Sequence, residues 1–338
     1  MIVLDGFGPE FVSPDSTPAI DRLAKSHFIA PAGGLADLVA STGPGHATLL
    51  TGAPSTVHGV IANRVFDPEG NPTGDVSVRV PTILRRAKNA GRSTAIAVSD
   101  PDILNTIHGT EAHFCFPSQA DVAEFADEKT GYIPDARTVD VVIDAVLEGY
   151  DLIVAQLQHT DTAAHAGGID SLLASDSRRA SDQAVGKIAE ALERDWERSL
   201  LIVVSDHRAE NVVETQPVRL AAALDGLAMV IEDGSAALVR PHDNRLGAVL
   251  SRARACTGVA AIMPLDNEHL VAWSEPGYVF GRERPITTRA SHGNGTTRPC
   301  LSLIAGGHPL VAEVGAHIRR TPPPLQLWAG VAARALHA

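Results

Sequence analysis

Acidic side chains directly follow several apolar runs in this sequence. Asp5 comes after the run 2–4, and the pair Asp206-His207 closely follows the run 200–204. Apolar runs of this length are typical of buried parallel strands, whose carboxyl ends meet at one edge of a sheet. Burying carboxylates and imidazoles there is costly unless a partner compensates for it. Asp5 alone is more typical of a solvated turn. Asp206 and His207, at the end of another buried strand, fit a solvated turn less well and make a shared polar site the alternative.

Asp161 and His165 form a second pair, spaced so that one helical turn would place both on the same face. In isolation, such a pair is as typical of a hydrogen-bonded surface contact as of a metal site. His292 stands in a glycine-containing loop and cannot be interpreted alone. Together, these positions offer three carboxylates and three imidazoles, which suit two borderline metal ions. Zinc is the most natural choice, with Mn²⁺ or iron as substitutes.

Two divalent ions facing three carboxylates would leave a local charge of about +1. That charge would let a protein of net charge −12 bind an anionic substrate. Phosphoryl transfer is the reaction that this electrostatics favours. In a two-metal site, one ion can activate the nucleophile while the other stabilises the leaving oxygen.

Thr42 is the candidate nucleophile. It stands in the segment 41–48, whose small residues would let a ligand and the following helix approach closely. A threonine hydroxyl is a poor nucleophile unless a base or a metal activates it. The alternative is that Thr42 caps the helix, and the two roles are compatible because a helix N-terminus also favours an incoming phosphate.

The elements that must position these residues alternate between strand and helix. Alternation of this kind predicts an α/β fold with a doubly wound, mostly parallel sheet and helices on both faces. Strands are expected at 2–4, 94–98, 152–158, 200–204 and 300–304. Helices are expected at 18–25, 81–89 and 185–192.

Residues 211–289 have a different pattern, with short strands expected at 228–231, 236–239 and 270–273 and one helix at 244–255. We interpret this stretch as a small inserted α/β cap subdomain. Residues 1–210 and 290–338 would then form the metal-binding core.

The composition of the chain limits the kinds of partner that it is expected to bind. The chain has 338 residues, of which 44% are hydrophobic and 20% are charged, as expected of a globular protein. The net negative charge disfavours nucleic acid or an anionic membrane as a partner. Because no apolar stretch is long enough to span a bilayer and no leader is recognisable, we expect a cytoplasmic protein. The sequence leaves open whether the protein forms a homodimer.

The ordered motifs resemble those of the alkaline phosphatase superfamily. Within it, the segment 51–59 and the following 62–64 look like the branch that contains phosphonoacetate hydrolase and the nucleotide pyrophosphatase/phosphodiesterases, which use threonine as nucleophile. Segments 79–84, 90–91 and 114–116 look closest to phosphonoacetate hydrolase. The five motifs that carry the superfamily resemblance are Asp5-Gly6, Thr42-x-Pro-x-His46, Asp161-x-x-x-His165, Ser205-Asp206-His207 and Ser291-His292-Gly293.

The resemblance implies a role for each matched residue. The core would hydrolyse phosphate esters or phosphonates through a phosphothreonine intermediate at Thr42. Asn63 would donate a hydrogen bond to a phosphoryl oxygen. One zinc would be held by Asp161, His165 and His292, and the other by Asp5, Asp206, His207 and the Thr42 hydroxyl.

Two departures from the resemblance concern the substrate. Phosphonoacetate hydrolase carries lysines that bind the substrate carboxylate where this chain has Asp100 and Asp102, so a neutral or amine-bearing substrate is easier to accommodate here. Arg208 replaces the usual glycine and could meet a phosphate charge, or form a surface salt bridge. Phe66 is the best-placed aromatic residue for stacking on a base, although a core position is the alternative.

The leading hypothesis is a dinuclear zinc hydrolase of small phosphate esters or phosphonates. A nucleotide pyrophosphatase/phosphodiesterase is one alternative. A phosphotransferase or phosphomutase on the same scaffold is another, although those relatives use serine. Sulfatase chemistry is disfavoured because position 42 is neither Cys nor Ser. A non-catalytic binding protein would be expected to lose a ligand residue.

Overall fold

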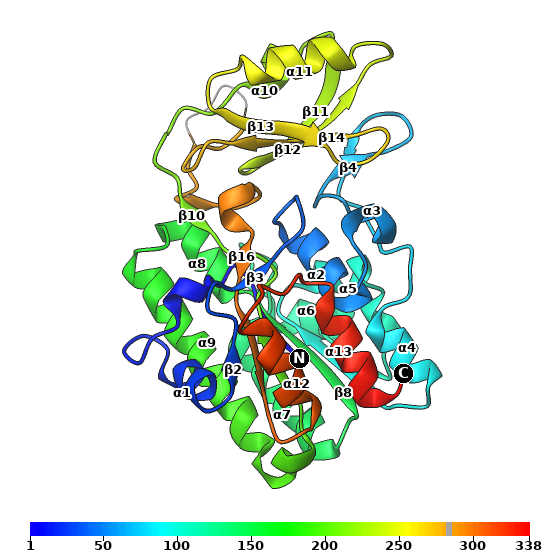
Figure 1. The fold of residues 1–338 in the computed structure, drawn as a ribbon, viewed down its shortest axis with the longest axis vertical. Coiled ribbons are helices and arrows are strands. Elements are labelled where there is room, and N and C mark those ends of the chain that lie inside the picture. Colours follow the sequence, from blue (N-terminus) through cyan, green and yellow to red (C-terminus); the bar gives the residue numbers. More distant parts are fainter. Residues whose placement is uncertain (282–285) are drawn as a thin grey trace.

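The computed structural model describes residues 1–281 and 286–338. A seven-stranded sheet forms its centre, in the order β2-β17-β9-β1-β8-β6-β7 (Figure 1). The five neighbours from β9 to β7 are parallel, whereas β17 is antiparallel to both β9 and β2. The strands are β1 (Ile2–Leu4), β2 (Phe28–Ile29), β6 (Thr94–Val98), β7 (Phe114–Phe116), β8 (Leu152–Leu157), β9 (Leu201–Val204) and β17 (Ser302–Ala305).

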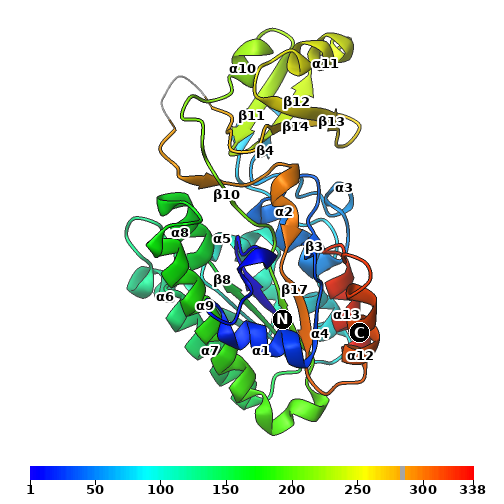
Figure 2. The same cartoon turned by 60° about the vertical axis from the view of Figure 1, so that its left-hand side comes forward.

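Helices cover both faces of this sheet, as Figure 2 shows. Successive strand residues point to opposite faces, so Val3 and Val154 belong to one apolar cluster while Ile2 and Ala155 belong to the other. The predicted doubly wound α/β fold is confirmed. One face carries α2 (Thr42–Thr51), α4 (Ile83–Asn89), α12 (Leu310–Ile318) and α13 (Leu327–Leu336), and the other carries α1 (Pro18–Ser26), α7 (Asp135–Glu148) and α9 (Leu172–Ala191).

Two local predictions differ from the structure. The run 300–304 was expected to be parallel, but β17 is antiparallel, because the chain enters it from the His292 segment at the carboxyl edge of the sheet and runs away from that edge. The helix expected from Pro81 begins at Ile83, because the Thr82 hydroxyl accepts a hydrogen bond from Arg85 N–H and caps it.

A second sheet of four antiparallel strands lies above the carboxyl edge of the first (upper part of Figure 1). Its apolar cluster includes Val239, Val249 and Ile262. The three strands and the helix expected in this region are present, and one further strand, 259–264, was not predicted. The elements are α10 (Leu220–Ala223), β11 (Ala228–Asp233), β12 (Ala236–Pro241), α11 (Leu246–Arg254), β13 (Val259–Pro264) and β14 (Leu270–Ser274).

Short elements connect the two sheets and carry several candidate residues. The two-stranded pairs β3–β16 and β10–β15 join distant segments, whereas β4 and β5 form a local antiparallel pair. Among the described residues, no helix is long and apolar enough to cross a membrane. The remaining bounds are β3 (Gly34–Leu35), α3 (Ser55–His58), β4 (Val65–Phe66), β5 (Pro72–Thr73), α5 (Pro101–Thr106), α6 (Gln119–Phe125), α8 (His159–Gly167), β10 (Glu210–Asn211), β15 (Ala290–Ser291) and β16 (Pro299–Cys300).

Candidate active site

The fold brings the strand-end acids and histidines together at the carboxyl edge of the large sheet. His207 Nε2 lies 3.5 Å from Asp5 Oδ1 and 3.2 Å from Asp206 Oδ2. All three side chains are fully buried. Asp5 follows β1 and Asp206 follows the adjacent strand β9, so the pairing of these two strands sets their separation.

Asp161, His165 and His292 form an adjoining cluster. Asp161 in the first turn of α8 and His165 in its last turn lie on one face, with His165 Nε2 3.3 Å from Asp161 Oδ2. His292 Nε2 lies 3.8 Å from Asp161 Oδ1. The rings of His292 and His207 are stacked with centroids 3.9 Å apart, so the two clusters meet along this pair.

Thr42 faces the first cluster, with its Oγ1 3.4 Å from His207 Nε2. It is the first residue of α2, and Ser41 takes the N-cap position without a side-chain cap, so the alternative role of Thr42 as the N-cap residue is wrong. Gly45, one turn further, lies against Asp206. A Cβ at position 45 would be 2.6 Å from Asp206 Cβ, which explains why the helix can approach this closely only with glycine there.

Burial and charge shift the protonation of the acids in the first cluster. Burial, with the charges of neighbouring aspartates, raises the pKa of both Asp5 and Asp206 well above the usual range. Burial also lowers the pKa of His207. The protein alone therefore does not hold this cluster in its fully charged form.

In the second cluster, Asp161 and His165 stabilise each other's charged forms. Burial opposes ionisation of Asp161, but the positive charge of His165, supported by His292 and His207, outweighs it and lowers the pKa of Asp161. The charge of Asp161 in turn raises the pKa of His165 to about 9. Burial lowers the pKa of His292.

Both clusters fit divalent cations. Among the described residues, Asp5 Oδ1, Asp161 Oδ1 and Asp206 Oδ2 are buried oxygens without a hydrogen-bond partner. Buried unpaired carboxylate oxygens are costly. One cation would compensate for Asp5 and Asp206, and a second would compensate for Asp161. Ligand atoms lie within 4.8 Å of one another in each of two sets, Asp5, Asp206 and His207 in one and Asp161, His207 and His292 in the other.

The predicted substrate residues lie at different positions around the clusters. Asn63 is next to the nucleophile, because its Oδ1 accepts a hydrogen bond of 2.8 Å from Gly43 N–H. Asp100 is buried at the N-cap of α5, where its Oδ1 accepts a hydrogen bond from Asp102 N–H. Burial raises the pKa of Asp100 to about 6. Asp102 itself is exposed.

Arg208 and Phe66 have other partners. The Arg208 guanidinium donates to Thr296 C=O at 2.8 Å and forms an ion pair of 3.1 Å with Glu10. Phe66 packs with the small sheet, where its ring stacks on His269 and lies under the Arg240 guanidinium. Their roles in substrate binding stay predictions.

Two residues that support the site were not assigned a role from the sequence. His46 is buried, and its Nδ1 lies 2.8 Å from Thr42 C=O and 3.5 Å from Asp206 Oδ2. Asp135 accepts hydrogen bonds from Gln158 N–H and His159 N–H, which fixes the start of α8. His46 belongs to the threonine motif, but Asp135 carries no local sequence signal because its partners are more than twenty positions away.

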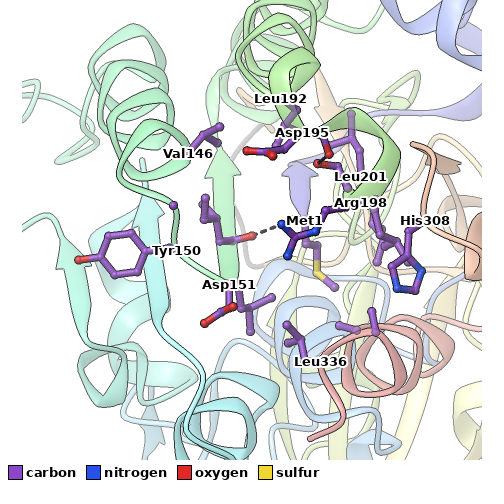
Figure 3. Close-up of a pocket in the computed structure, with 18 of the residues that line it drawn as sticks. Met1, Val146, Tyr150, Asp151, Leu192, Asp195, Arg198, Leu201, His308 and Leu336 are labelled. Carbon is purple, nitrogen blue, oxygen red and sulfur yellow. Dashed lines mark hydrogen bonds between the residues drawn. The ribbon is translucent and has the colours of Figure 1, made fainter.

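A separate cavity of about 600 Å³ lies at the opposite end of the large sheet (Figure 3). Met1, Asp151 and Leu201, near the amino ends of β1, β8 and β9, contribute to its lining, together with Arg198 and His308. None of the candidate site residues lines it. The candidate residues lie instead at the carboxyl edge, where α/β folds of this kind bind ligands.

Comparison with known proteins identifies the family. The type I phosphodiesterase / nucleotide pyrophosphatase family matches residues 1–289. The chain belongs to this family. It is an enzyme, a metal-dependent hydrolase of phosphoric esters or phosphonates, as the resemblance to the alkaline phosphatase superfamily indicated. No curated protein is similar enough in sequence to match.

Solved structures share the fold of this family member at low sequence identity. Murine ectonucleotide pyrophosphatase / phosphodiesterase 5, an inactive variant in complex with AMP, has a TM-score of 0.78 and 18% identity, covering 99% of this chain and 94% of that chain. Phosphonoacetate hydrolase from Sinorhizobium meliloti, in complex with phosphonoacetate, has a TM-score of 0.74 and 15% identity, with the same coverage of 99% and 94%.

Proposed function

We propose that this enzyme is a two-zinc hydrolase of small phosphate esters or phosphonates with Thr42 as its nucleophile. The observation that carries the proposal is the position of Thr42 Oγ1, 3.4 Å from His207 where the two carboxylate–imidazole clusters meet. A hydroxyl at that point can reach a phosphorus atom held between two cations.

The residues divide into two ligand sets in this proposal. When bound, the two zinc ions would supply positive charge for the phosphoryl group and favour ionisation of the nucleophile and the leaving oxygen. Mn²⁺ or iron would be substitutes with similar ligand preferences. One ion would be held by Asp161, His165 and His292, and the other by Asp5, Asp206, His207 and Thr42.

Thr42 would form a P–O bond as the bond from phosphorus to the leaving group breaks. Water would then release the phosphoryl group and restore the hydroxyl, so each turnover includes two displacements at phosphorus. Thr42 is fixed for this role by α2. Among the described residues, its own N–H is the one first-turn donor left for an anion, because Gly43 N–H donates to Asn63 and Pro44 has no N–H. Asn63 would donate from Nδ2 to a phosphoryl oxygen, since Gly43 N–H already engages its Oδ1.

Asp100 is the residue that would select among substrates. Burial raises the pKa of Asp5 most, followed by the charges of Asp206, Asp161 and, last, Asp100. Gln156 also links the two residues, since it accepts from Asp100 N–H and donates to Asp5. A carboxylate at this position would disfavour a substrate with an anionic tail and would favour a neutral or amine-bearing one. Residues 211–289 would form a cap over this side of the core.

Nucleotides are a second candidate class of substrate. The family includes nucleotide pyrophosphatases, and the murine structure of similar fold contains AMP. Phe66 would be the stacking residue for a base. Transfer to a second substrate hydroxyl, as in a phosphomutase, is the less favoured reaction because the nucleophile is threonine.

A substrate panel on zinc-loaded protein tests the proposal. The panel would include aryl phosphate monoesters and diesters, nucleotides and short phosphonates. Thr42→Ala should lose turnover by orders of magnitude while retaining zinc, and Thr42→Ser should keep part of the rate. Phosphothreonine at position 42 should be found after rapid quenching. A Thr42→Ala enzyme with a near wild-type rate would refute the proposal.

A further inference from the structure

Two buried glutamines link the carboxylates of the two clusters. Gln156, in β8, donates from Nε2 to Asp5 Oδ2 at 3.2 Å and to Gln158 Oε1 at 2.7 Å. Gln158 donates from its own Nε2 to Asp161 Oδ2 at 3.4 Å. The two glutamines are only 1% and 2% exposed, so water cannot replace these contacts easily.

The orientation of the Gln156 amide is fixed by the neighbouring strand. Its Oε1 accepts hydrogen bonds of 3.0 Å from both Ser99 N–H and Asp100 N–H, which follow β6. A flipped amide would place its NH₂ group against two N–H donors and its oxygen against a carboxylate. The observed orientation is therefore the one that satisfies all four hydrogen-bonding positions of Gln156.

The glutamines engage one oxygen of each carboxylate and leave the other. Asp5 Oδ2 and Asp161 Oδ2 receive the amide donors, while Asp5 Oδ1 and Asp161 Oδ1 are the buried oxygens without a hydrogen-bond partner among the described residues. These unpaired oxygens face His207 and His292 respectively, at 3.5 and 3.8 Å. At Asp161 the amide shares Oδ2 with His165 Nε2, 3.3 Å away. In both aspartates the contacted oxygen is Oδ2, which leaves Oδ1 to be offered to a cation.

We propose that Gln156 and Gln158 are positioning residues that orient Asp5 and Asp161 toward two metal ions and couple the two metal sites. The inference rests on the proposed two-metal function. Partners of metal ligands fix ligand orientation, and their removal typically weakens metal affinity by about 10- to 100-fold. Neutral amide donors suit this position because they hold the carboxylates without cancelling the negative charge that a cation needs.

Each glutamine is expected to affect a different site first. Gln158 contacts Asp161 directly and reaches Asp5 only through Gln156. Gln156 contacts Asp5 directly and also holds Gln158 in place. Loss of Gln158 should therefore weaken mainly the ion held by Asp161, whereas loss of Gln156 should weaken both.

Titration of metal-free protein with Zn²⁺ alone tests the inference. Methionine has nearly the shape of glutamine without its hydrogen bonds, so Gln158→Met and Gln156→Met are the test variants. Gln183→Met, on an exposed position of α9, is the matched control. Calorimetry with a competing chelator would give the stoichiometry and the two dissociation constants. We expect Gln158→Met to raise one of them by about 10- to 100-fold and the control to leave both unchanged.

A second variant guards against loss of folding. Gln158→Leu removes the same donor with a neutral side chain of similar volume. It should fold, with thermal melting of the metal-free protein as the check, and should still weaken zinc binding. A wild-type protein that binds no zinc would refute the proposed function and, with it, the positioning role of the two glutamines. Two zinc ions bound equally well by wild type, Gln158→Met and Gln158→Leu would refute the positioning role of the glutamines alone.

Discussion

Gly45→Ala is a substitution by one methyl group that should disable the site. Position 45 lies inside α2, at the point where the helix meets the end of β9. The new Cβ would be 2.6 Å from Asp206 Cβ and 3.0 Å from Asp206 C=O. Favourable carbon–carbon contacts lie at about 3.5–4.0 Å, so one of the two segments must move by about 1 Å.

Two opposing effects set the magnitude. Replacing glycine by alanine within a helix contributes about 1 kcal/mol to stability. Overpacking of a well-packed interior costs about 1–3 kcal/mol, so the net loss of unfolding free energy should be between about 0 and 2 kcal/mol. The effect on catalysis should be larger, because a 1 Å displacement of a catalytic group can reduce the rate by about 100-fold.

Hydrolysis of bis(4-nitrophenyl) phosphate by zinc-loaded protein measures the activity, and urea unfolding measures the stability. Gly330→Ala is the control, since position 330 is also helical and a Cβ there meets no atom within 4 Å. The control should keep full activity and gain stability. A Gly45→Ala enzyme that behaves like the control would refute the position of Asp206 against α2 and the ligand role built on it.

Two further predictions concern charge. Asp100→Asn retains the acceptor that caps α5. It should raise kcat/KM for a carboxylated phosphate ester by roughly 5- to 50-fold relative to a neutral analogue, whereas Asp102→Asn, at an exposed position, should not. Equal effects of the two variants would show that Asp100 does not face the substrate. Metal binding should release protons, because only the deprotonated side chains are ligands. In the metal-free protein, burial raises the pKa of Asp5, and the charge of Asp161 raises the pKa of His165 to about 9. The affinity for Mn²⁺ should accordingly rise with pH toward about 9, which calorimetry in two buffers of different ionisation enthalpy would detect; a pH-independent affinity without proton release would contradict it.

Local sequence patterns were sufficient to predict the site residues that stand at strand ends or on one helix face. Asp5 and Asp206 follow apolar runs that form neighbouring strands, so their proximity follows from the parallel sheet alone. Asp161 and His165 are one helical turn apart in α8. The sheet and its helices were predictable for the same reason, since burial on both faces produces the continuous apolar runs.

Contacts between distant segments could not be predicted in this way. His292 reaches the site because its loop follows β15, which pairs with β10 across about eighty residues. Arg208 pairs with Glu10, almost two hundred positions away. Strand β13 alternates poorly between apolar and polar residues, and its pairing with β14 defines it as a strand. Such contacts depend on the tertiary fold rather than on spacing.

The central claim is that two metal ions occupy the two clusters at the carboxyl edge of the large sheet. Anomalous diffraction at the zinc absorption edge, from crystals of the zinc-loaded enzyme, tests it most directly. The account predicts two peaks, one among Asp161, His165 and His292 and the other among Asp5, Asp206 and His207. A single peak, or peaks located away from these residues, would contradict it.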